Sequence, residues 1–260
     1  MRKLFIAPPI VRKEGFDFLG YHSYSEYNYL QKSFISGIKR RHFEIALDLT
    51  SDSFFKTDVI DFGCADGIFL PSLSHYFSSV LGIEREKEFV FLAQEIIKDL
   101  ALKNVKIINN ENVSIQELKT ESLKKDYKII FLLEVLEHVG RNYQSMYEDK
   151  ITLLKEISSL VNNEGMIIVS VPKMIGLSFL IQHIGLTVMN MKRAKYSFKE
   201  LMSSAFLGDT SGVEKYWVPY VTHQGFNHKK LEKYLNQDFF IVKKRDDFFQ
   251  VVYVIKKKQM

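Results

Sequence analysis

A short segment with acidic residues and glycines, Asp61-Phe62-Gly63-Cys64-Ala65-Asp66-Gly67, could bind a ligand. It follows an apolar, β-rich run and precedes a helical pattern that starts at Ile68. Glycines in a tight turn between a strand and a helix let the backbone approach a ligand closely. Glu84 ends the next β-rich run, where its carboxylate can accept hydrogen bonds from both hydroxyls of a ribose. The spacing therefore predicts a nucleoside site.

The positions of the glycines argue against a dinucleotide as the ligand. A pyrophosphate needs Gly-x-Gly-x-x-Gly in order to sit on the helix N-terminus. Counting from Gly63, the third and sixth positions are Ala65 and Ile68. Asp66 would also place a carboxylate beside the anion, whereas an acid there suits a ligand with an ammonium and a sulfonium centre.

A second group of polar residues has the pattern Glu-x-x-Glu-His, formed by Glu134, Glu137 and His138. A further histidine, His223, occurs later in the chain. Carboxylates and imidazoles at such spacing can bind Mg²⁺ or a transition metal. Alternatively, His138 or His223 could act as a general base toward an acceptor hydroxyl. The histidine of the pattern could also fasten a loop or line a pocket, so the residues alone leave these uses open.

Short β-rich runs alternate with helical patterns over the middle of the chain, which predicts βαβ units and a parallel sheet. Two further runs near the C-terminus predict an antiparallel hairpin. The expected fold is α/β, a doubly wound Rossmann-like sheet of seven mostly parallel strands. The seven runs are 59–62, 80–83, 105–108, 128–132, 166–170, 239–242 and 248–255.

Two segments fall outside this predicted core, which comprises residues 57–172 and 223–260. Residues 1–56 contain apolar positions at near-helical spacing, so an N-terminal helical extension is expected. Residues 173–222 break the alternation and are too many for a structureless loop. They predict an inserted helical cap, or lid.

The cap begins with an apolar helical pattern over residues 174–189, followed by Lys192-Arg193-Ala194-Lys195. This pattern is too short and too interrupted for a confident membrane span, but an interfacial helix with a basic flank has this form. A buried helix that closes over the site is the alternative. Aromatic residues after it would line a pocket. These are Tyr216, Trp217, Tyr220 and Phe226.

The single cysteine, Cys64, excludes an intramolecular disulfide and a cysteine-based zinc cluster. A reducing compartment fits best, so a cytoplasmic location is predicted, with peripheral membrane contact as an open alternative. The formal charge of +5 favours anionic partners, including nucleic acid and membrane surfaces. Solvated lysines at strand ends explain the same excess more simply. The oligomeric state is not indicated by the sequence.

Taken together, these motifs resemble those of the class I S-adenosylmethionine-dependent methyltransferases, in particular the group typified by ubiquinone-biosynthesis O-methyltransferases. The resemblance covers about Asp58 to Pro172, with the motifs in the right order. The matching stretches are Val59–Gly67, Gly82–Glu84, Glu134–Val139 and Leu160–Pro172.

The resemblance implies that S-adenosylmethionine is the cofactor and assigns roles by position. Asp61, Gly63 and Gly67 would surround the methionyl part, and Glu84 the ribose. Where the family often has Gly-Asp-Ala near the adenine, this chain has Asn110-Glu111-Asn112. An arginine before the first strand would bind the cofactor carboxylate; Arg41 is the candidate and Arg40 an equal rival. The cofactor-binding residues predicted in this way are Arg41, Asp61, Gly63, Cys64, Gly67, Glu84, Arg85, Glu111, Asn112, Leu133 and Glu134.

The implied reaction is methyl transfer to an oxygen of a small molecule, sugar or lipid-linked acceptor, with a nitrogen as the alternative acceptor atom. An alternative is metal-assisted methylation of an RNA ribose 2′-hydroxyl. The small-RNA 3′-terminal 2′-O-methyltransferases use a similar Glu-x-x-Glu-His and a later histidine to bind a metal. In this chain the ligands would be Glu134, Glu137, His138 and His223. A non-catalytic cofactor-binding module is the second alternative.

Overall fold

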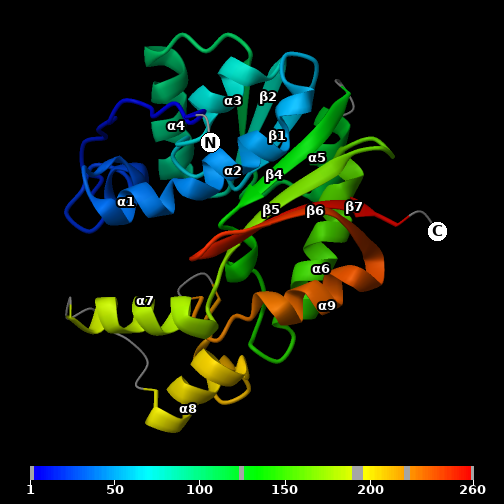
Figure 1. The fold of residues 1–260 in the computed structure, drawn as a ribbon. Coiled ribbons are helices and arrows are strands. Elements are labelled where there is room, and N and C mark those ends of the chain that lie inside the picture. The colour runs from blue at the N-terminus through cyan, green and yellow to red at the C-terminus, as the bar shows by residue number, and fades with distance from the viewer. Residues whose placement is uncertain (1–2, 123–125, 189–195, 220–222, 259–260) are drawn as a thin grey trace.

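The computed structural model describes residues 3–122, 126–188, 196–219 and 223–258, and its centre is a seven-stranded sheet (Figure 1). The strand order is β3-β2-β1-β4-β5-β7-β6. The strands are β1 (Asp58–Phe62), β2 (Ser79–Glu84), β3 (Val105–Asn109), β4 (Tyr127–Leu133), β5 (Met166–Pro172), β6 (Phe239–Asp246) and β7 (Gln250–Lys257).

The pairing confirms the predicted sheet. Strands β1 to β5 pair in parallel, and β7 pairs antiparallel with both β5 and β6. The chain winds from β1 toward β3 on one side and then crosses to β4 on the other. In such sheets, ligands bind outside the carboxyl ends of the strands where the winding direction changes. Here that point lies between β1 and β4.

Helices cover both faces of the sheet, because alternate strand residues are apolar on both sides. In β4, Ile129 and Phe131 belong to one core, and Ile130 and Leu132 to the other. Helices α2, α3 and α4 cover the first face and α5, α6 and α9 the second (Figure 1). The helices are α1 (Phe34–Lys39), α2 (Arg41–Leu49), α3 (Leu70–Tyr76), α4 (Lys87–Asp99), α5 (Ile115–Ser122), α6 (Met146–Ile157), α7 (Gly176–Val188), α8 (Phe198–Met202) and α9 (His228–Asp238).

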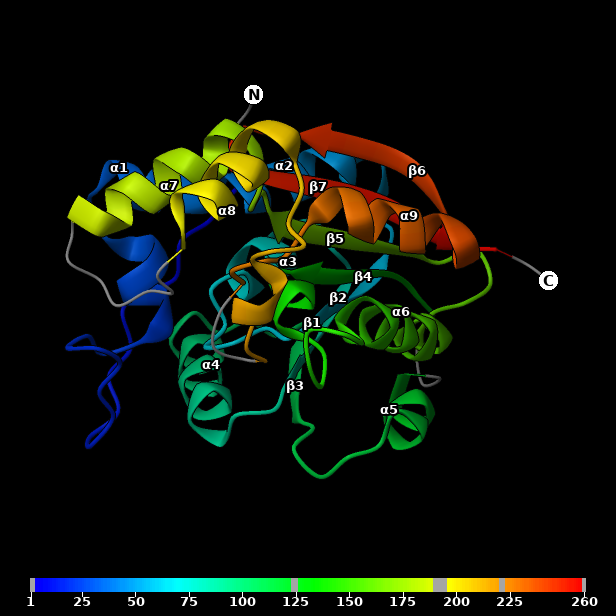
Figure 2. The same ribbon diagram turned by 90° about the horizontal axis from the view of Figure 1, so that it is seen from below.

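Between β5 and α9 the chain forms α7, α8 and two short turns, η5 (Ser203–Leu207) and η6 (Glu214–Tyr216), which together we call the cap. Both α7 and α8 pack on η5 (Figure 2). These elements lie in the segment predicted as an insertion, and the limits of the three predicted parts are retained as a proposal. Within the described ranges, no helix is long and apolar enough to cross a membrane.

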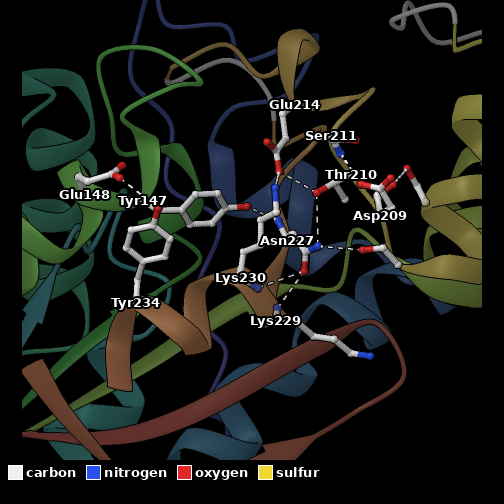
Figure 3. Close-up of polar contacts among 12 residues, drawn as sticks. Tyr147, Glu148, Asp209, Thr210, Ser211, Glu214, Asn227, Lys229, Lys230 and Tyr234 are labelled. Carbon is white, nitrogen blue, oxygen red and sulfur yellow. Dashed lines mark hydrogen bonds and ion pairs between the residues drawn. The ribbon is translucent and has the colours of Figure 1, made fainter. Parts of the chain in front are cut away.

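Asn227 joins the end of the cap to the core (Figure 3). Its side-chain oxygen accepts a hydrogen bond from the backbone N–H of Lys229, and Asn227 thereby caps the N-terminus of α9. Its side-chain amide donates to the Gly208 carbonyl and to Thr210 Oγ1 in the cap, at 3.1 and 3.3 Å. Its backbone N–H donates to the Tyr147 hydroxyl on α6 at 2.9 Å. One buried side chain therefore connects the cap to the first turn of α9.

Asn227→Ala removes the helix cap and leaves buried cap groups without a partner, so we expect it to lower the free energy of unfolding by about 1–3 kcal/mol. Urea unfolding followed by circular dichroism measures this change. Asn236→Ala, at an exposed position of the same helix, is the matched control and should stay within about 0.5 kcal/mol of the unmutated protein. Equal stability of the two variants would contradict the assigned role.

Candidate functional site

A cavity of about 70 Å³ lies at the carboxyl ends of β1 and β4. Five of the residues predicted to bind the cofactor line it: Asp61, Gly63, Cys64, Leu133 and Glu134. The sheet thus brings together residues that are about seventy positions apart in the sequence. The other lining residues are Tyr24, Tyr29, Phe43, Ala65, Ile68, Phe69 and Val135.

The backbone of the glycine turn explains why its residue types are needed. Gly63 has a φ of 78°, and a Cβ atom placed on it would lie 2.6 Å from Cγ2 of Val135. The turn after β1 can therefore pass the turn after β4 only without a side chain. Gly67 has a φ of 86°, and a Cβ there would lie 3.0 Å from Cβ of Ala93 on α4. Gly67 thus permits close helix packing, whereas Gly63 shapes the cavity.

Asp61 places a buried carboxyl group in the cavity wall. Its side chain is 4% exposed, and its Oδ2 atom has no hydrogen-bond partner. Burial, together with the nearby Glu84 carboxylate, raises the pKa of Asp61 to about 8. A buried polar atom without a partner is costly. A positively charged ligand group in the cavity would both satisfy this oxygen and favour the ionised form.

Glu84 is held firmly at the end of β2. Its Oε2 accepts a hydrogen bond from the Ala65 N–H at 2.9 Å, and its Oε1 accepts from the N–H groups of Arg85 and Glu86 at 2.7 and 2.9 Å. Glu84 therefore connects β2 directly to the glycine turn. A carboxylate has about four acceptor positions, so one remains after these three bonds.

The other six predicted residues do not line the cavity: Arg41, Gly67, Glu84, Arg85, Glu111 and Asn112. Of these, Arg85, Glu111 and Asn112 are exposed. The Arg85 side chain is half exposed and pairs with Glu86 at 2.9 Å. Glu111 pairs with Lys87 on α4 at 2.7 Å, and Asn112 is exposed beside it. All three follow the ends of β2 or β3, next to Glu84 along the same edge of the sheet. Their assignment to the ribose and adenine stays a prediction.

The expectation that Asp66 faces the ligand is wrong. Asp66 is 1% exposed and does not line the cavity. Its carboxylate accepts hydrogen bonds from the backbone N–H of Ser25, at 2.7 Å, and from the Ser25 hydroxyl. The sequence positions Asp66 in the turn but does not fix the direction of its side chain. In the fold it fastens the N-terminal segment to the glycine turn.

This attachment brings in two residues that the sequence analysis missed. Tyr24 precedes Ser25, and both Tyr24 and Tyr29 line the cavity, with their hydroxyl groups hydrogen-bonded to each other. Burial raises the pKa of both tyrosines. The only signal for them in the sequence is the high density of tyrosines between residues 21 and 29.

The structure does not bring Arg41, the predicted partner of the cofactor carboxylate, to the cavity. Arg41 begins α2, and its Nε atom pairs with Oδ2 of Asp247 at 3.2 Å, in the turn between β6 and β7. Neither Arg41 nor its rival Arg40 lines the cavity. Lys39 is the cation near the site instead. It donates to Asn28 at 2.7 Å, and its charge acts on Glu134 and His223.

Glu134 follows β4 in a strained backbone conformation, with a φ of 56°. Ser170 on β5 stabilises this conformation, since its hydroxyl accepts from the Glu134 N–H and donates to Glu134 Oε1, both at 2.9 Å. Glu137 is hydrogen-bonded to Glu134, and burial raises the pKa of both. Burial therefore favours the neutral form of both carboxyl groups.

The turn that carries Glu137 is fixed from behind by a buried lysine and by the cap. Lys150 on α6 donates to the Val139 carbonyl at 2.6 Å and lies over the Trp217 ring, 4.6 Å from its centroid. Burial lowers the pKa of Lys150 to about 7, although the charge of Glu137 opposes this shift. The Trp217 indole N–H donates to the Glu137 carbonyl at 2.9 Å. Trp217 thus supports the acidic turn, whereas Tyr220 lies outside the described residues.

The two predicted histidines lie beyond Glu137, away from the cavity wall. His138 Nε2 is 3.8 Å from Glu137 Oε1, and the rings of His138 and His223 are 6.0 Å apart. Burial lowers the pKa of each histidine to about 4, so both are neutral at pH 7. These contacts join the four residues one after another and not around a common centre. We call this arrangement the row; its order is Glu134, Glu137, His138, His223.

This arrangement does not support the predicted metal site. Within residues 3–122, 126–188, 196–219 and 223–258, no group of three or more histidine, cysteine, aspartate or glutamate side chains is placed to hold a metal ion. A metal site needs its donors to converge on one point. The four predicted ligands contact one another in sequence, and Glu137 Oε2 and His138 Nδ1 are buried without a hydrogen-bond partner among the described residues, but their donor atoms do not meet at one point.

The raised pKa of Asp61 has a consequence for stability. Because the pKa is about 8 in the folded chain and ordinarily 3.8, folding stability falls as the pH rises between these values. Asp61→Asn removes this loss and should be more stable than the unmutated protein at pH 8 by at least about 1 kcal/mol, but not at pH 4. Urea unfolding at both pH values measures the difference. The control, Asp52→Asn on the surface, should gain nothing at either pH, and a pH-independent effect of Asp61→Asn would contradict the argument.

The comparisons with known proteins agree with this geometry. Residues 31–233 match a family model described as a methyltransferase domain. A search of curated proteins found no match. The fold is similar to that of an S-adenosylmethionine-dependent methyltransferase from Clostridium acetobutylicum ATCC 824, with a TM-score of 0.53 and 12% identity, covering 85% of this chain and 92% of that chain.

Two further solved structures have similar folds. One is a SAM-dependent methyltransferase from Anabaena variabilis ATCC 29413, with a TM-score of 0.53 and 16% identity, covering 83% of each chain. The other is the N-methyltransferase NodS from Bradyrhizobium japonicum WM9 in complex with S-adenosyl-L-homocysteine, with a TM-score of 0.50 and 12% identity, covering 85% of this chain and 88% of that chain. At these identities the structures show the fold, and the family model covers most of the chain. The chain therefore belongs to the methyltransferase domain family.

Proposed function

We propose that this methyltransferase transfers a methyl group to an oxygen atom of a small molecule, sugar or lipid-linked acceptor. The observation that carries the proposal is the placement of Asp61 and Glu134 in the wall of one cavity, at the ends of β1 and β4. Asp61 offers an unpaired buried oxygen, and Glu134 offers a carboxyl group hydrogen-bonded to another. The first suits a cationic cofactor group and the second a proton that leaves the acceptor.

The residues of the glycine turn fit S-adenosylmethionine. The ammonium group of the methionyl part would satisfy the Oδ2 atom of Asp61, which has no other partner. Because Gly63 has no side chain, the cofactor can approach the backbone of the turn closely. Glu84 keeps one acceptor position for a ribose hydroxyl. Arg85, Glu111 and Asn112 remain our candidates for the ribose and adenine. When bound, the cofactor supplies a methyl group that its sulfonium centre has already activated.

On the acceptor side, the residues of this chain position the hydroxyl group and receive its proton. Tyr24 and Tyr29 form part of the cavity wall and reduce its contact with water. The acceptor oxygen loses its proton as the methyl group arrives, and the Glu134 carboxylate is the acidic group of the β4 turn that faces the cavity. The neutral His138 and His223, which we still propose as bases, lie next in the row beyond Glu137.

The alternatives differ in their support. The hypothesis of RNA 2′-O-methylation requires a metal ion held by Glu134, Glu137, His138 and His223. The arrangement of these donors in the described residues does not favour a metal site. A non-catalytic module is disfavoured by the intact set of Asp61, Gly63 and Glu84. The narrower resemblance to ubiquinone-biosynthesis O-methyltransferases stays a prediction, and it is the reason for proposing oxygen rather than nitrogen as the acceptor atom.

Titration calorimetry with S-adenosylhomocysteine tests the cofactor site. We expect Asp61→Ala and Glu84→Ala each to weaken binding at least about tenfold, which corresponds to about 1.4 kcal/mol. Glu86→Ala, which removes an exposed carboxylate next to Glu84, is the matched control and should bind normally. No heat from the unmutated, folded protein would rule out the proposed function.

The dependence of turnover on metal and salt separates the proposed reaction from RNA modification. With labelled S-adenosylmethionine and pooled small-molecule and lipid extracts as acceptors, incorporation of the label should be unchanged by EDTA. It should also depend only weakly on salt. Activity that requires a divalent metal and transfers label to RNA, with binding that weakens steeply with salt, would favour the alternative instead.

A further inference from the structure

One face of α7 is apolar and exposed. Leu177, Ile181 and Ile184 are 58%, 44% and 53% exposed, and their spacing places them on the same side of the helix. The opposite side is buried through Ser178 and Phe179. The sequence left open whether this helix is buried over the site or lies at an interface. The structure shows that it is buried on one side only.

The elements packed next to α7 continue this apolar surface. In η5, which contacts α7, Phe206 and Leu207 are 65% and 80% exposed. In α8, which also contacts η5, Phe198 is 77% exposed. Isolated exposed apolar residues are ordinary on soluble proteins, but several on three adjoining elements mark an interaction site.

This surface lies at the same end of the sheet as the candidate site. Helix α7 follows β5 directly, so it starts at the carboxyl end of the sheet, as the cavity does. Figures 1 and 2 place α1 at the same end of the molecule as α7. In α1, Phe34 and Ile35 are also strongly exposed. Exposed apolar side chains therefore occur on both α1 and the cap, at this end of the molecule.

The charges around this surface identify its partner. Residues 176–188 contain no charged side chain. Among the acidic residues of the cap, Glu200 and Glu214 are paired with Lys215 and Lys230, and the exposed Asp209 accepts a hydrogen bond from the Ser211 N–H. Lys199 on α8 and Lys32 before α1 are exposed close in sequence to the apolar residues. The basic flank at Lys192, Arg193 and Lys195 lies outside the described residues. An apolar face bordered by cations suits an anionic lipid surface. In a twofold dimer the same cations would approach their own copies.

We propose that the exposed face of α7, with the adjoining apolar residues of η5, α8 and α1, docks on an anionic lipid bilayer. Docking brings the cavity edge to the membrane, where an acceptor with a lipid tail can present its hydroxyl group. The assignment of a lipid-linked acceptor rests on the proposed function. The docking itself does not rest on the proposed function, because vesicle binding is measured without turnover.

Co-sedimentation with phosphatidylcholine vesicles, with and without phosphatidylglycerol, tests the proposal. The unmutated protein should bind the anionic vesicles and bind the neutral ones more weakly. The triple variant Leu177→Ser, Ile181→Ser, Ile184→Ser should lose at least about tenfold in affinity, because each change removes apolar area from the bilayer. Lys199→Glu should weaken binding to the anionic vesicles only. The control, Phe240→Ser on β6, removes an equally exposed apolar residue from the far edge of the sheet and should bind as before.

Two results would overturn the docking surface. One is a failure of the unmutated protein to bind the vesicles, or binding by the triple variant that equals that of the unmutated protein. The other is a dimer, detected by light scattering, that the triple variant abolishes, because the face would then join two copies of the chain. Circular dichroism and binding of S-adenosylhomocysteine check that each variant is folded. If the unmutated protein does not bind S-adenosylhomocysteine, the proposed function is rejected. The measured vesicle binding is not affected by that result.

Discussion

The site depends on the parallel pairing of β1 with β4. The register sets Asp61 opposite Phe131, so both strands end at the same edge of the sheet. Since β2 lies on the other side of β1, the chain leaves β1 and β4 toward opposite halves of the molecule. The two turns that follow must pass each other closely, and the absence of a side chain at Gly63 lets Val135 fill the space where one would be. Without this contact, Asp61 and Glu134 would not share a cavity.

The sequence was sufficient for those parts of the site that the sheet determines. Strand periodicity located β1 and β4, and residues at their ends, such as Asp61 and Leu133, line the cavity as the motif order implied. Residues carried by helices and loops were harder to predict. Lys39, Arg40 and Arg41 occupy successive positions about 100° apart around a helical turn, so composition cannot decide which one points inward. Only packing on the turn between β6 and β7 showed that Arg41 points away.

The N-terminal segment shows why the remaining residues could not be predicted. Tyr24 and Tyr29 belong to no strand, and no repeating pattern relates them to the sheet. Their place follows from long-range contacts: Ser25 bonds to Asp66, forty-one positions away, Tyr24 packs on Phe89, and Tyr29 packs on Phe43. A polar residue in a turn can bond to a ligand, to the backbone or to a distant segment, and its type is the same in each case. The sequence therefore identified Asp66 as important but assigned it the wrong partner.

The contact between Ser25 and Asp66 also determines how the cavity wall is assembled. The turns after β1 and β4 continue directly from strands of the sheet, whereas Tyr24 and Tyr29 come from the N-terminal segment. Asp66 fastens that segment to the glycine turn through Ser25. A residue that does not line the cavity therefore supports two of the side chains that do, and a change at Asp66 would reach the site through them.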